Sequence, residues 1–491
     1  MKTLVLFFLL PVSCLLAQDS LQTKRAAVVK EFVTGYNNQN LSSFFALFPE
    51  PRTDLTTERK KQIEAQINDG EAKRFQELGK AHIDTMTFDG RNRVTVKLSF
   101  EKDRDEISTI NFFFSADTLM GFGQKPTEFN YTRLSSSAPL GTKALSAKGA
   151  KIDSLFTHKF VPDGFNGCAI VLSDGKPVYK HCFGYANYDT KVPLNDSSVF
   201  ELASVSKQFT AMGIMILAEQ RKLKYSDPVK KFIPELPYEG ITVENLLTHT
   251  SGLPDYIRQM DASWDKSKFA TNYDIIKEFR KDTPAVLFAP NEKFTYSNTG
   301  YAMLSVIIEK ASGMSYGAFL KKYIFAPLKM THSRVYNTRR STGETIPNYA
   351  FGYIDVNDSG LYMLPDSVAD LDIVRYLDGI TGDGSVNSTI LDLAKWDEGL
   401  YSNKLVSSAT LKQAYSKHIL SSGKESFYGY GEFLPTDSTA EPLVYHSGGW
   451  PGYHTFILRM LDHRKTVIVL SNNSFPGISE MADKITKVLV K

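Results

Sequence analysis

This sequence of 491 residues contains little cysteine and no large excess of positive or negative charge. Its three cysteines cannot form a disulfide framework, which excludes a small fold held together by disulfides. The 57 Lys and Arg residues balance 54 Asp and Glu, and a net charge of +3 without a basic block argues against a nucleic-acid-binding protein. With 42% hydrophobic and 23% charged residues, the chain is not globally disordered. The composition therefore predicts an ordinary folded protein, long enough for more than one domain.

The N-terminus contains a short apolar run, from Leu4 to Leu10, behind the single positive charge of Lys2. A membrane span needs about 20 apolar residues, so this run is too short, and we expect no integral membrane span. A charge, a short apolar stretch and a small residue predict a signal peptide over residues 1–17, cleaved after Ala17. A lipoprotein attached through Cys14 is the alternative, which Pro11 disfavours. We therefore expect an exported protein, periplasmic or extracellular.

Cys168 and Cys182 remain in the mature chain and flank a hairpin pattern with Asp174-Gly175 at its turn. A two-residue turn there places Cys168 opposite His181 and directs Cys182 to the other face. A three-residue loop would restore the pairing. We interpret the two cysteines as small buried thiols, with a disulfide as the alternative.

The region before residue 151 shows two kinds of periodicity. Apolar residues recur at helical spacing from Leu21 to Phe48, and residues 94–100 alternate as in a half-buried strand. Helices followed by antiparallel strands predict a small α+β accessory domain over 18–134, without a catalytic constellation. It resembles the cone-shaped, nuclear-transport-factor-like domains that precede some secreted hydrolases. Residues 135–150 contain no aromatic and no acidic residue, which predicts a linker.

Residues 151–491 place strands at both ends and helices between them. The hairpin 167–182 comes first, a helix-rich region runs from 204 to about 401, and two strands at 453–461 and 465–471 precede a terminal helix. The simplest assembly is an α+β or α/β fold, in which an antiparallel sheet is flanked by helices and carries an inserted helical subdomain.

Ser204 and Lys207 open an apolar helical stretch. A spacing of three places both side chains on one helix face, one turn apart. The helix dipole would stabilise a developing alkoxide at the helix start, and a neutral lysine amine could accept its proton. The same Ser-x-x-Lys pattern occurs at Ser99–Lys102, Ser263–Lys266 and Ser421–Lys424. Alone, it is therefore a weak signal.

Two further motifs follow in order, Tyr296-Ser297-Asn298 and His446-Ser447-Gly448-Gly449. With these three motifs, residues 151–491 resemble the serine β-lactamase and penicillin-binding-protein family, in its class C and D-alanyl-D-alanine carboxypeptidase branch. Three flanking stretches add to the match: Phe183–Asn187, Leu246–Leu253 and Gly382–Thr389.

The resemblance implies an acyl-enzyme mechanism on amide or ester bonds. Ser204 would attack the substrate carbonyl, while Lys207 and Tyr296 share general acid and base duty. Asn298 would bind the substrate amide and help to position Lys207. The N–H groups of Ser204 and Gly449 would form the oxyanion hole. The substrate would be a small molecule or a peptide, such as a peptidoglycan stem peptide.

His446 departs from the family pattern, because class C β-lactamases carry a lysine at this position. A lysine offers a fixed cation to a substrate carboxylate, whereas histidine is mostly neutral above pH 6.5. This favours a D-peptidase or an esterase over a β-lactamase. A class C-type β-lactamase is the second hypothesis, and a penicillin-binding sensor or scaffold with little turnover is the third.

Several other residues are candidates for structural roles. A second Tyr-Ser-Asn at 401–403 follows a helical pattern and is interpreted as a surface loop. His249 is interpreted as structural, while Trp450 either lines the cleft or only packs. The nine histidines show no spacing typical of a metal site, and no glycine loop suggests phosphate binding. We therefore expect no metal and no cofactor.

Overall fold

The computed structural model contains two compact units, 1–130 and 131–491. It describes residues 12–47, 65, 71–72, 75–76, 78–89, 93–102, 108–115, 118–124, 142–161, 163–355, 362–368, 371–434 and 442–490. Each unit has its own hydrophobic core.

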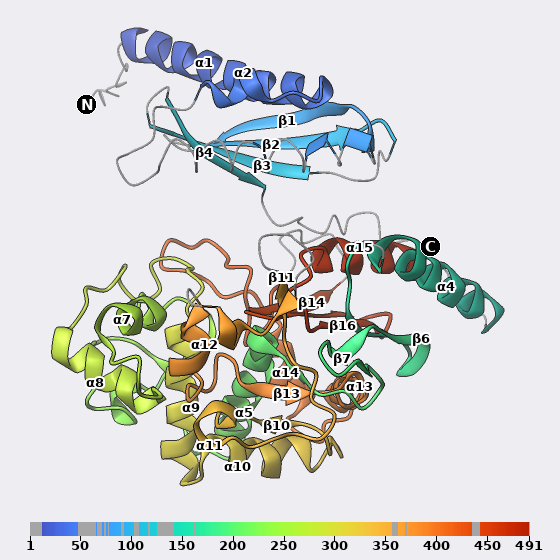
Figure 1. Cartoon of the computed structure of the whole chain (residues 1–491). Helices are drawn as coiled ribbons and strands as arrows, with labels where there is room; N and C mark the ends of the chain where they lie inside the picture. Colours follow the sequence, from blue (N-terminus) through green and yellow to red (C-terminus); the bar gives the residue numbers. More distant parts are fainter. Residues whose placement is uncertain are drawn as a thin grey trace, which may run out of the picture. The chain divides into compact units, whose positions relative to one another are not determined.

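In its described residues, the first unit combines helices α1 and α2 with a four-stranded antiparallel sheet in the order β1-β2-β3-β4 (Figure 1). The elements are α1 (Val12–Asn37), α2 (Ser42–Phe45), β1 (Ala81–Asp89), β2 (Arg93–Phe100), β3 (Ser108–Ser115) and β4 (Thr118–Gln124). Its core joins Phe32 and Tyr36 of α1 to the alternating side chains of β2, as the two periodicities predict. Residues 1–11 of the expected signal peptide lie outside the described residues, and α1 begins within its last part.

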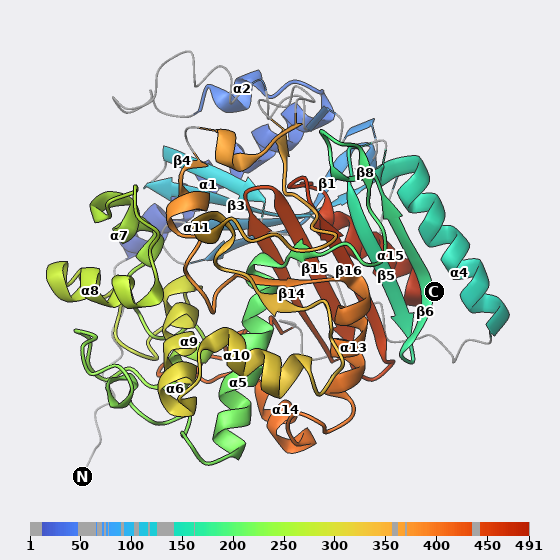
Figure 2. The same ribbon diagram turned by 60° about the horizontal axis from the view of Figure 1, so that its bottom comes forward.

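The second unit is built around a five-stranded antiparallel sheet in the order β14-β15-β16-β5-β6. These strands are β5 (Gly167–Ser173), β6 (Lys176–Phe183), β14 (Leu443–Trp450), β15 (Tyr453–Met460) and β16 (Lys465–Ser471). Helices α4 (Thr142–Leu155) and α15 (Ile478–Val490) cover one face and α13 (Ile390–Leu400) covers the other (Figure 2). Because both faces are covered, β5 and β16 are buried along their whole length.

The chain between β6 and β14 forms the predicted helical insertion (Figure 2). A short sheet in the order β10-β13-β9 lies within it. The remaining elements of the second unit are η2 (Phe156–Phe160), β7 (Tyr185–Asn187), β8 (Val192–Pro193), β9 (Phe200–Glu201), η3 (Ala203–Ser206), α5 (Lys207–Glu219), η4 (Val229–Lys231), α6 (Val243–Leu247), α7 (Tyr256–Ser263), α8 (Asn272–Asp282), α9 (Asn298–Ser312), α10 (Tyr316–Leu320), η5 (Lys321–Phe325), β10 (Arg334–Val335), α11 (Arg339–Thr342), β11 (Ile354–Asp355), β12 (Tyr362–Met363), η7 (Pro365–Ser367), α12 (Ile373–Tyr376), β13 (Val386–Ser388) and α14 (Ser408–Ala414). The predicted sheet, flanking helices and inserted helical region are all confirmed.

The linker predicted over 135–150 is only partly compatible with the structure. Helix α4 begins at Thr142, so residues 142–150 are helical, and residues 135–141 lie outside the described residues. The absence of aromatic and acidic residues did not distinguish a linker from a helix, because Ala, Leu and Lys are good helix formers. The first helix of the second unit therefore starts earlier than the composition suggested.

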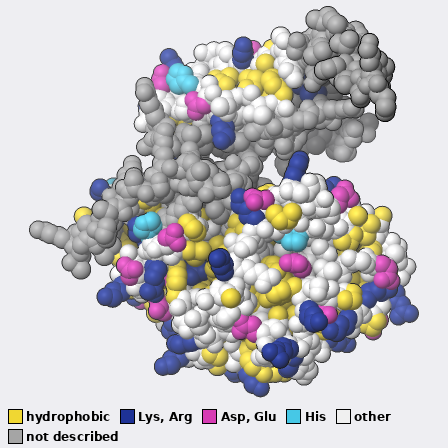
Figure 3. All heavy atoms as spheres, turned by 180° about the vertical axis from the view of Figure 1, so that it is seen from behind, with side chains coloured by type: hydrophobic (Ala, Val, Ile, Leu, Met, Phe, Trp, Pro, Cys, Tyr) yellow, Lys and Arg dark blue, Asp and Glu magenta, His cyan; other side chains and the backbone are white. Residues whose placement is uncertain are grey.

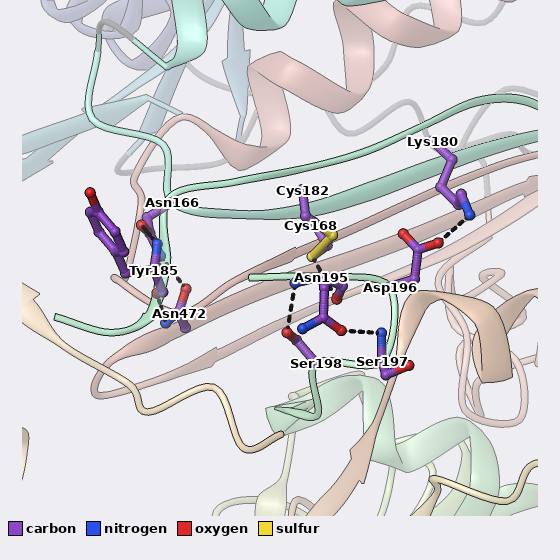
Figure 4. Close-up of a disulfide and its surroundings, with 10 residues drawn as sticks. All are labelled: Asn166, Cys168, Lys180, Cys182, Tyr185, Asn195, Asp196, Ser197, Ser198 and Asn472. Carbon is purple, nitrogen blue, oxygen red and sulfur yellow. Dashed lines mark hydrogen bonds and ion pairs between the residues drawn. A yellow bond between two sulfur atoms is a disulfide. The ribbon is translucent and has the colours of Figure 1, made fainter. Parts of the chain in front are cut away.

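The hairpin β5–β6 corrects the interpretation of its cysteines as free thiols. Asp174 and Gly175 form the predicted two-residue turn, and both have positive φ, as this hairpin type requires. The register then shifts by one residue, which leaves Val178 without a partner and brings Cys168 opposite Cys182. The two cysteines form a disulfide between the neighbouring strands (Figure 4). A bulge, which the turn signal could not reveal, decided their pairing.

The surface of the second unit carries charges of both signs. On the face seen in Figure 3, Lys and Arg side chains are interspersed with Asp and Glu and with hydrophobic side chains. Within the described part of the chain, no helix is both long and apolar enough to cross a bilayer.

Candidate active site

Ser204 lies in the short 3-10 helix η3, directly before α5 begins at Lys207. In a 3-10 helix, side chains three residues apart stand one above the other, so this local geometry aligns Ser204 with Lys207. The preceding Ala203 has φ of 48°, in the left-handed region that is costly for a residue with a Cβ. Ser204 is half-buried and lines a pocket that is open to solvent. The serine is therefore accessible and lies at the start of the helical stretch, in the 3-10 turn that directly precedes α5.

Lys207 is completely buried and links three separate segments of the chain. Its Nζ atom lies 3.1 Å from Oγ of Ser204, 2.8 Å from Oδ1 of Asn298 and 2.8 Å from the carbonyl oxygen of Asp383. The three motif residues Ser204, Lys207 and Asn298 are thus brought together by direct hydrogen bonds.

These three contacts restrict what a neutral Lys207 can do. A neutral amine has two N–H donors and one lone pair. The carbonyl of Asp383 and the side-chain oxygen of Asn298 can only accept, so they take the two N–H groups. The lone pair is left facing Ser204, the only one of the three partners with a proton to give. This is the arrangement that a general base for the serine requires.

The Tyr296-Ser297-Asn298 motif forms the start of α9. Ser297 is the N-cap of this helix, and its hydroxyl accepts a hydrogen bond from the N–H of Gly300 at 3.1 Å. The cap fixes Asn298 in the first helical position, from which it reaches Lys207. Tyr296, one residue before the cap, is half-buried, and the centre of its ring lies 4.9 Å from Nζ of Lys207. The motif thus brings a tyrosine and an amide to the same lysine.

His249 supports this motif from behind. It is completely buried, and its Nδ1 accepts a hydrogen bond of 3.0 Å from the N–H of Ser297. Its ring centre lies 4.3 Å from that of Tyr296. Burial, and then the nearby charge of Lys207, hold the pKa of His249 well below its usual value. A neutral histidine that orients the tyrosine motif agrees with its structural interpretation.

His446 is buried on the edge strand β14 and bonded at both ring nitrogens. Nδ1 lies 2.6 Å from the carbonyl oxygen of Ser447, which can only accept, so Nδ1 carries the proton. Nε2 must then accept the hydroxyl proton of Tyr428, at 2.9 Å. Burial, followed by the charge of Lys207, lowers the pKa of His446 to about 3. His446 is therefore a neutral, fully bonded imidazole rather than a cation.

The glycines of the third motif allow β14 to pass close to the serine. A Cβ at Gly448 would lie 2.3 Å from the carbonyl oxygen of Leu202 and 3.1 Å from the backbone nitrogen of Ser204. Only glycine fits such an approach. Gly449, the next residue, lines the same pocket as Ser204, whereas Ser447, two residues earlier on the strand, is not among the lining residues. The two residues expected to supply the oxyanion-hole N–H groups thus border one pocket.

The pocket at Ser204 opens to solvent and has a volume of about 560 Å³ when the solvent-filled space at its mouth is included. Trp450 lines it and also packs against the hydrophobic core, so the two roles considered for this residue are combined. The second Tyr-Ser-Asn, at 401–403, forms a turn after α13 and is not part of the pocket lining, as predicted. No cluster of three or more His, Cys, Asp or Glu suited to a metal is present within the described residues.

Three contributors to the site were missed by sequence analysis. The carbonyl of Asp383 holds Lys207, and its carboxylate accepts a 2.8 Å hydrogen bond from the hydroxyl of Tyr256. Tyr428 determines the tautomer of His446. Asp383 lies in a stretch that matches the family, but Tyr256 and Tyr428 are ordinary aromatic residues in the sequence, and only the fold reveals their partners.

The chain is similar to known proteins both in sequence and in structure. The sequence profile of the family described as Beta-lactamase matches residues 159–489. Penicillin-binding protein 4* of Bacillus subtilis (strain 168) is 48% identical over 325 residues, which cover 66% of this chain and 72% of that protein. The similarity therefore lies in the second unit.

Solved structures with the same fold include two that share at least 25% sequence identity with this chain. The octameric penicillin-binding protein homologue from Pyrococcus abyssi is 30% identical, with a TM-score of 0.58, and the match covers 70% of this chain and 77% of that one. The D-amino acid amidase from Ochrobactrum anthropi SV3, complexed with L-phenylalanine amide, is 25% identical, with a TM-score of 0.56 over 71% of this chain and 97% of that one. The fold predicted for residues 151–491 is thereby confirmed.

Proposed function

Since this chain belongs to the β-lactamase family of serine hydrolases, we propose that it is an exported enzyme that acylates Ser204 with D-amino-acid peptides, D-amino-acid amides or small esters. The observation that carries the proposal is the contact between Ser204 and Lys207, in which a neutral lysine can only turn its lone pair toward the serine hydroxyl. The family membership alone leaves the substrate open.

The acylation step follows from this contact. Oγ of Ser204 bonds to the substrate carbonyl carbon while its proton passes to Nζ of Lys207, and the carbonyl electron pair moves onto oxygen. The N–H groups of Ser204 and Gly449 would stabilise that oxyanion, a contribution of about 3 kcal/mol for each donor in comparable enzymes. Collapse of the intermediate breaks the amide or ester bond, and the leaving amine or alcohol takes a proton from the Lys207–Tyr296 pair.

Deacylation repeats these steps with water. A water molecule attacks the acyl carbon and gives its proton to the same base pair. Oγ of Ser204 leaves and recovers that proton, which regenerates the free enzyme and releases a carboxylic acid. The buried position of Lys207 supports this cycle, since exclusion of bulk water strengthens its interactions with the reacting atoms.

His446 supports a D-peptidase, amidase or esterase over a β-lactamase. A neutral imidazole with both nitrogens occupied offers no cation to the carboxylate of an antibiotic. Two relatives are named as penicillin-binding proteins and one solved neighbour as a D-amino acid amidase, which supports D-amino-acid substrates. The competing activities are a class C-type β-lactamase and a penicillin-binding sensor that acylates without turnover.

Labelling of the serine tests the proposal. The mature protein and its Ser204→Ala variant are incubated separately with a fluorescent penicillin and with a fluorophosphonate, and intact masses are measured. We expect one adduct on the wild-type protein and none on the variant. No adduct from either reagent on the wild-type protein would refute the assignment of Ser204 as nucleophile.

A panel of substrates then separates the activities. D-Ala-D-Ala peptides, D-amino acid amides, nitrophenyl esters and a chromogenic cephalosporin are compared by kcat/KM. Turnover of the cephalosporin above the others would establish the β-lactamase alternative, and stable labelling without turnover of any substrate would establish the sensor. Export is tested by the N-terminal residue of the secreted protein, which we expect to be Gln18.

A further inference from the structure

Glu201 is an acidic residue beside the nucleophile to which the mechanism gives no role. It ends the short strand β9, three residues before Ser204, and its neighbour across the sheet is Asn387 of β13. Glu201 and Ser204 line the same pocket. Three steps of about 3.8 Å along the chain separate their Cα atoms by roughly 11 Å at most. A substrate the size of one or two amino acids can therefore span both residues.

The other carboxylates next to Glu201 already have partners. Arg340 donates hydrogen bonds to Asp378 at 2.7 Å and to Asp366 at 3.0 Å, and Arg339 pairs with Asp366 at 3.2 Å. Two arginines therefore form ion pairs with two aspartates. Among the described residues, Glu201 makes no hydrogen bond and no ion pair through its side chain. When ionised, Glu201 raises this cluster to three carboxylates against two guanidinium groups.

Burial of Glu201 disfavours that charge. Burial raises the pKa of Glu201 to about 7, against the opposing effect of Arg340 and Arg339. An ionised carboxylate without a partner is costly in such a place, and a cation that entered the pocket would relieve the cost. A positively charged ligand in the pocket would therefore stabilise the ionised form of Glu201.

The rest of the pocket suits a positively charged ligand. Among the described residues that line it, none is a lysine or an arginine. Tyr336 and Trp450 also border the pocket, and aromatic rings attract cations. A substrate carboxylate would instead meet an acidic lining.

We propose that Glu201 is the binding site for an ammonium group of the substrate, so that the enzyme prefers amides, peptides and esters with a free amine close to the scissile carbonyl. This inference rests on the proposed function and narrows its substrate class. Acyl donors that carry an amine are preferred over substrates that end in a carboxylate at this position.

The test uses three p-nitroanilides that differ in charge. D-alanine p-nitroanilide carries the ammonium, isobutyric p-nitroanilide replaces that group by a methyl of similar size, and succinic p-nitroanilide carries a carboxylate. Each kcat/KM is divided by the alkaline hydrolysis rate of the same compound, which removes differences in intrinsic reactivity. For the wild-type protein we expect the ammonium compound to exceed its methyl isostere by about 10- to 100-fold, as for a hydrogen bond to a charged group, and the carboxylate compound to be poorest.

Glu201→Gln keeps the shape of the side chain and removes its charge. We expect the ratio of the ammonium to the methyl compound to fall close to one. Glu235→Gln removes a charge from an exposed residue outside the pocket, and it should leave the ratio at the wild-type value. Thermal unfolding and fluorophosphonate titration of Ser204 measure the folded, reactive fraction of each variant.

The outcomes separate the two proposals. A wild-type protein that labels at Ser204 but shows no preference for the ammonium compound overturns the inference alone, whether or not Glu201→Gln folds. An unchanged ratio in a folded Glu201→Gln variant overturns it as well. Failure of Ser204 to label with any reagent overturns the proposed function itself.

Discussion

The two sides of the Ser204 pocket differ in how their polar groups are satisfied. On the lysine side, Asn298 lines the pocket while Lys207 and His446 are buried, and each of these side chains is bonded to other groups of the protein. On the acidic side, formed by Asp378 and Glu201, one carboxylate is held by an arginine and the other has no partner within the described residues. Side chains whose hydrogen bonds are all made within the protein can hold the reacting groups in a fixed geometry. A carboxylate without a partner in the protein can instead bind a ligand that supplies one. The difference suggests that the lysine side performs the chemistry and the acidic side chooses the substrate.

The largest effect is expected from Lys207→Met, which keeps the length of the side chain and removes the base. We expect the rate of Ser204 labelling by the fluorophosphonate to fall by about 10³- to 10⁴-fold, because the serine loses its proton acceptor. Lys424→Met, in the exposed Ser421–Lys424 pair, is the matched control and should label at the wild-type rate. Equal rates in the two variants would remove Lys207 from the chemistry.

His446→Lys is the next strongest perturbation, because it places an ammonium where burial and Lys207 already hold an imidazole neutral. We expect a loss of about 3–5 kcal/mol in the free energy of unfolding, the usual cost of a buried charge without a partner. Urea denaturation measures the change. His446→Gln, which retains an acceptor for Tyr428, is the neutral control and should cost less. A stable His446→Lys variant that gains activity on a cephalosporin would contradict this expectation, because position 446 would then tolerate an ammonium group.

Tyr296→Phe should lower kcat/KM by about 100-fold with little effect on folding, because the hydroxyl shares proton transfer while the ring supplies the packing. Tyr401→Phe makes the same change in the second Tyr-Ser-Asn, outside the pocket lining. That variant should retain wild-type kinetics. If the two phenylalanine variants were equally active, the tyrosine of the family motif would have no catalytic role in this chain.

The smallest effect, measured for each unit of pH, concerns stability in acid. The pKa of His446 is about 3 in the folded protein and about 6.5 in an unfolded chain. The unfolded state therefore binds the proton first, and the wild-type protein loses stability as the pH falls from about 6.5 toward 3. Relative to His446→Gln, we expect a loss of about 1.4 kcal/mol for each pH unit in this range. Parallel stability curves for the two proteins would mean that folding leaves the pKa of His446 unchanged.

Much of this site was predictable because its motifs have local causes. Ser204 and Lys207 are aligned by a single turn, and Ser297 caps its own helix, so neighbouring residues determine both arrangements. The partners of His446 were not predictable, since Tyr428 reaches it from a separate segment of the chain. For the first unit, the resemblance to nuclear-transport-factor-like domains stays a prediction.

The cysteine pair shows the limit of local reasoning most directly. Asp174-Gly175 determined the turn, but the unpaired Val178 shifted the register and joined Cys168 to Cys182. A bulge arises from the packing of the whole sheet, so no turn signal encodes it.

By itself, the sequence predicted the fold class of the second unit and the groups that are proposed to react, because periodicity and short spacings carry that information within a few residues. The tertiary structure alone decided which groups are left without a partner. Glu201 becomes the incomplete member of its cluster only when α11 brings Arg340 to Asp366 and Asp378. Charge balance depends on distance in space rather than on order along the chain.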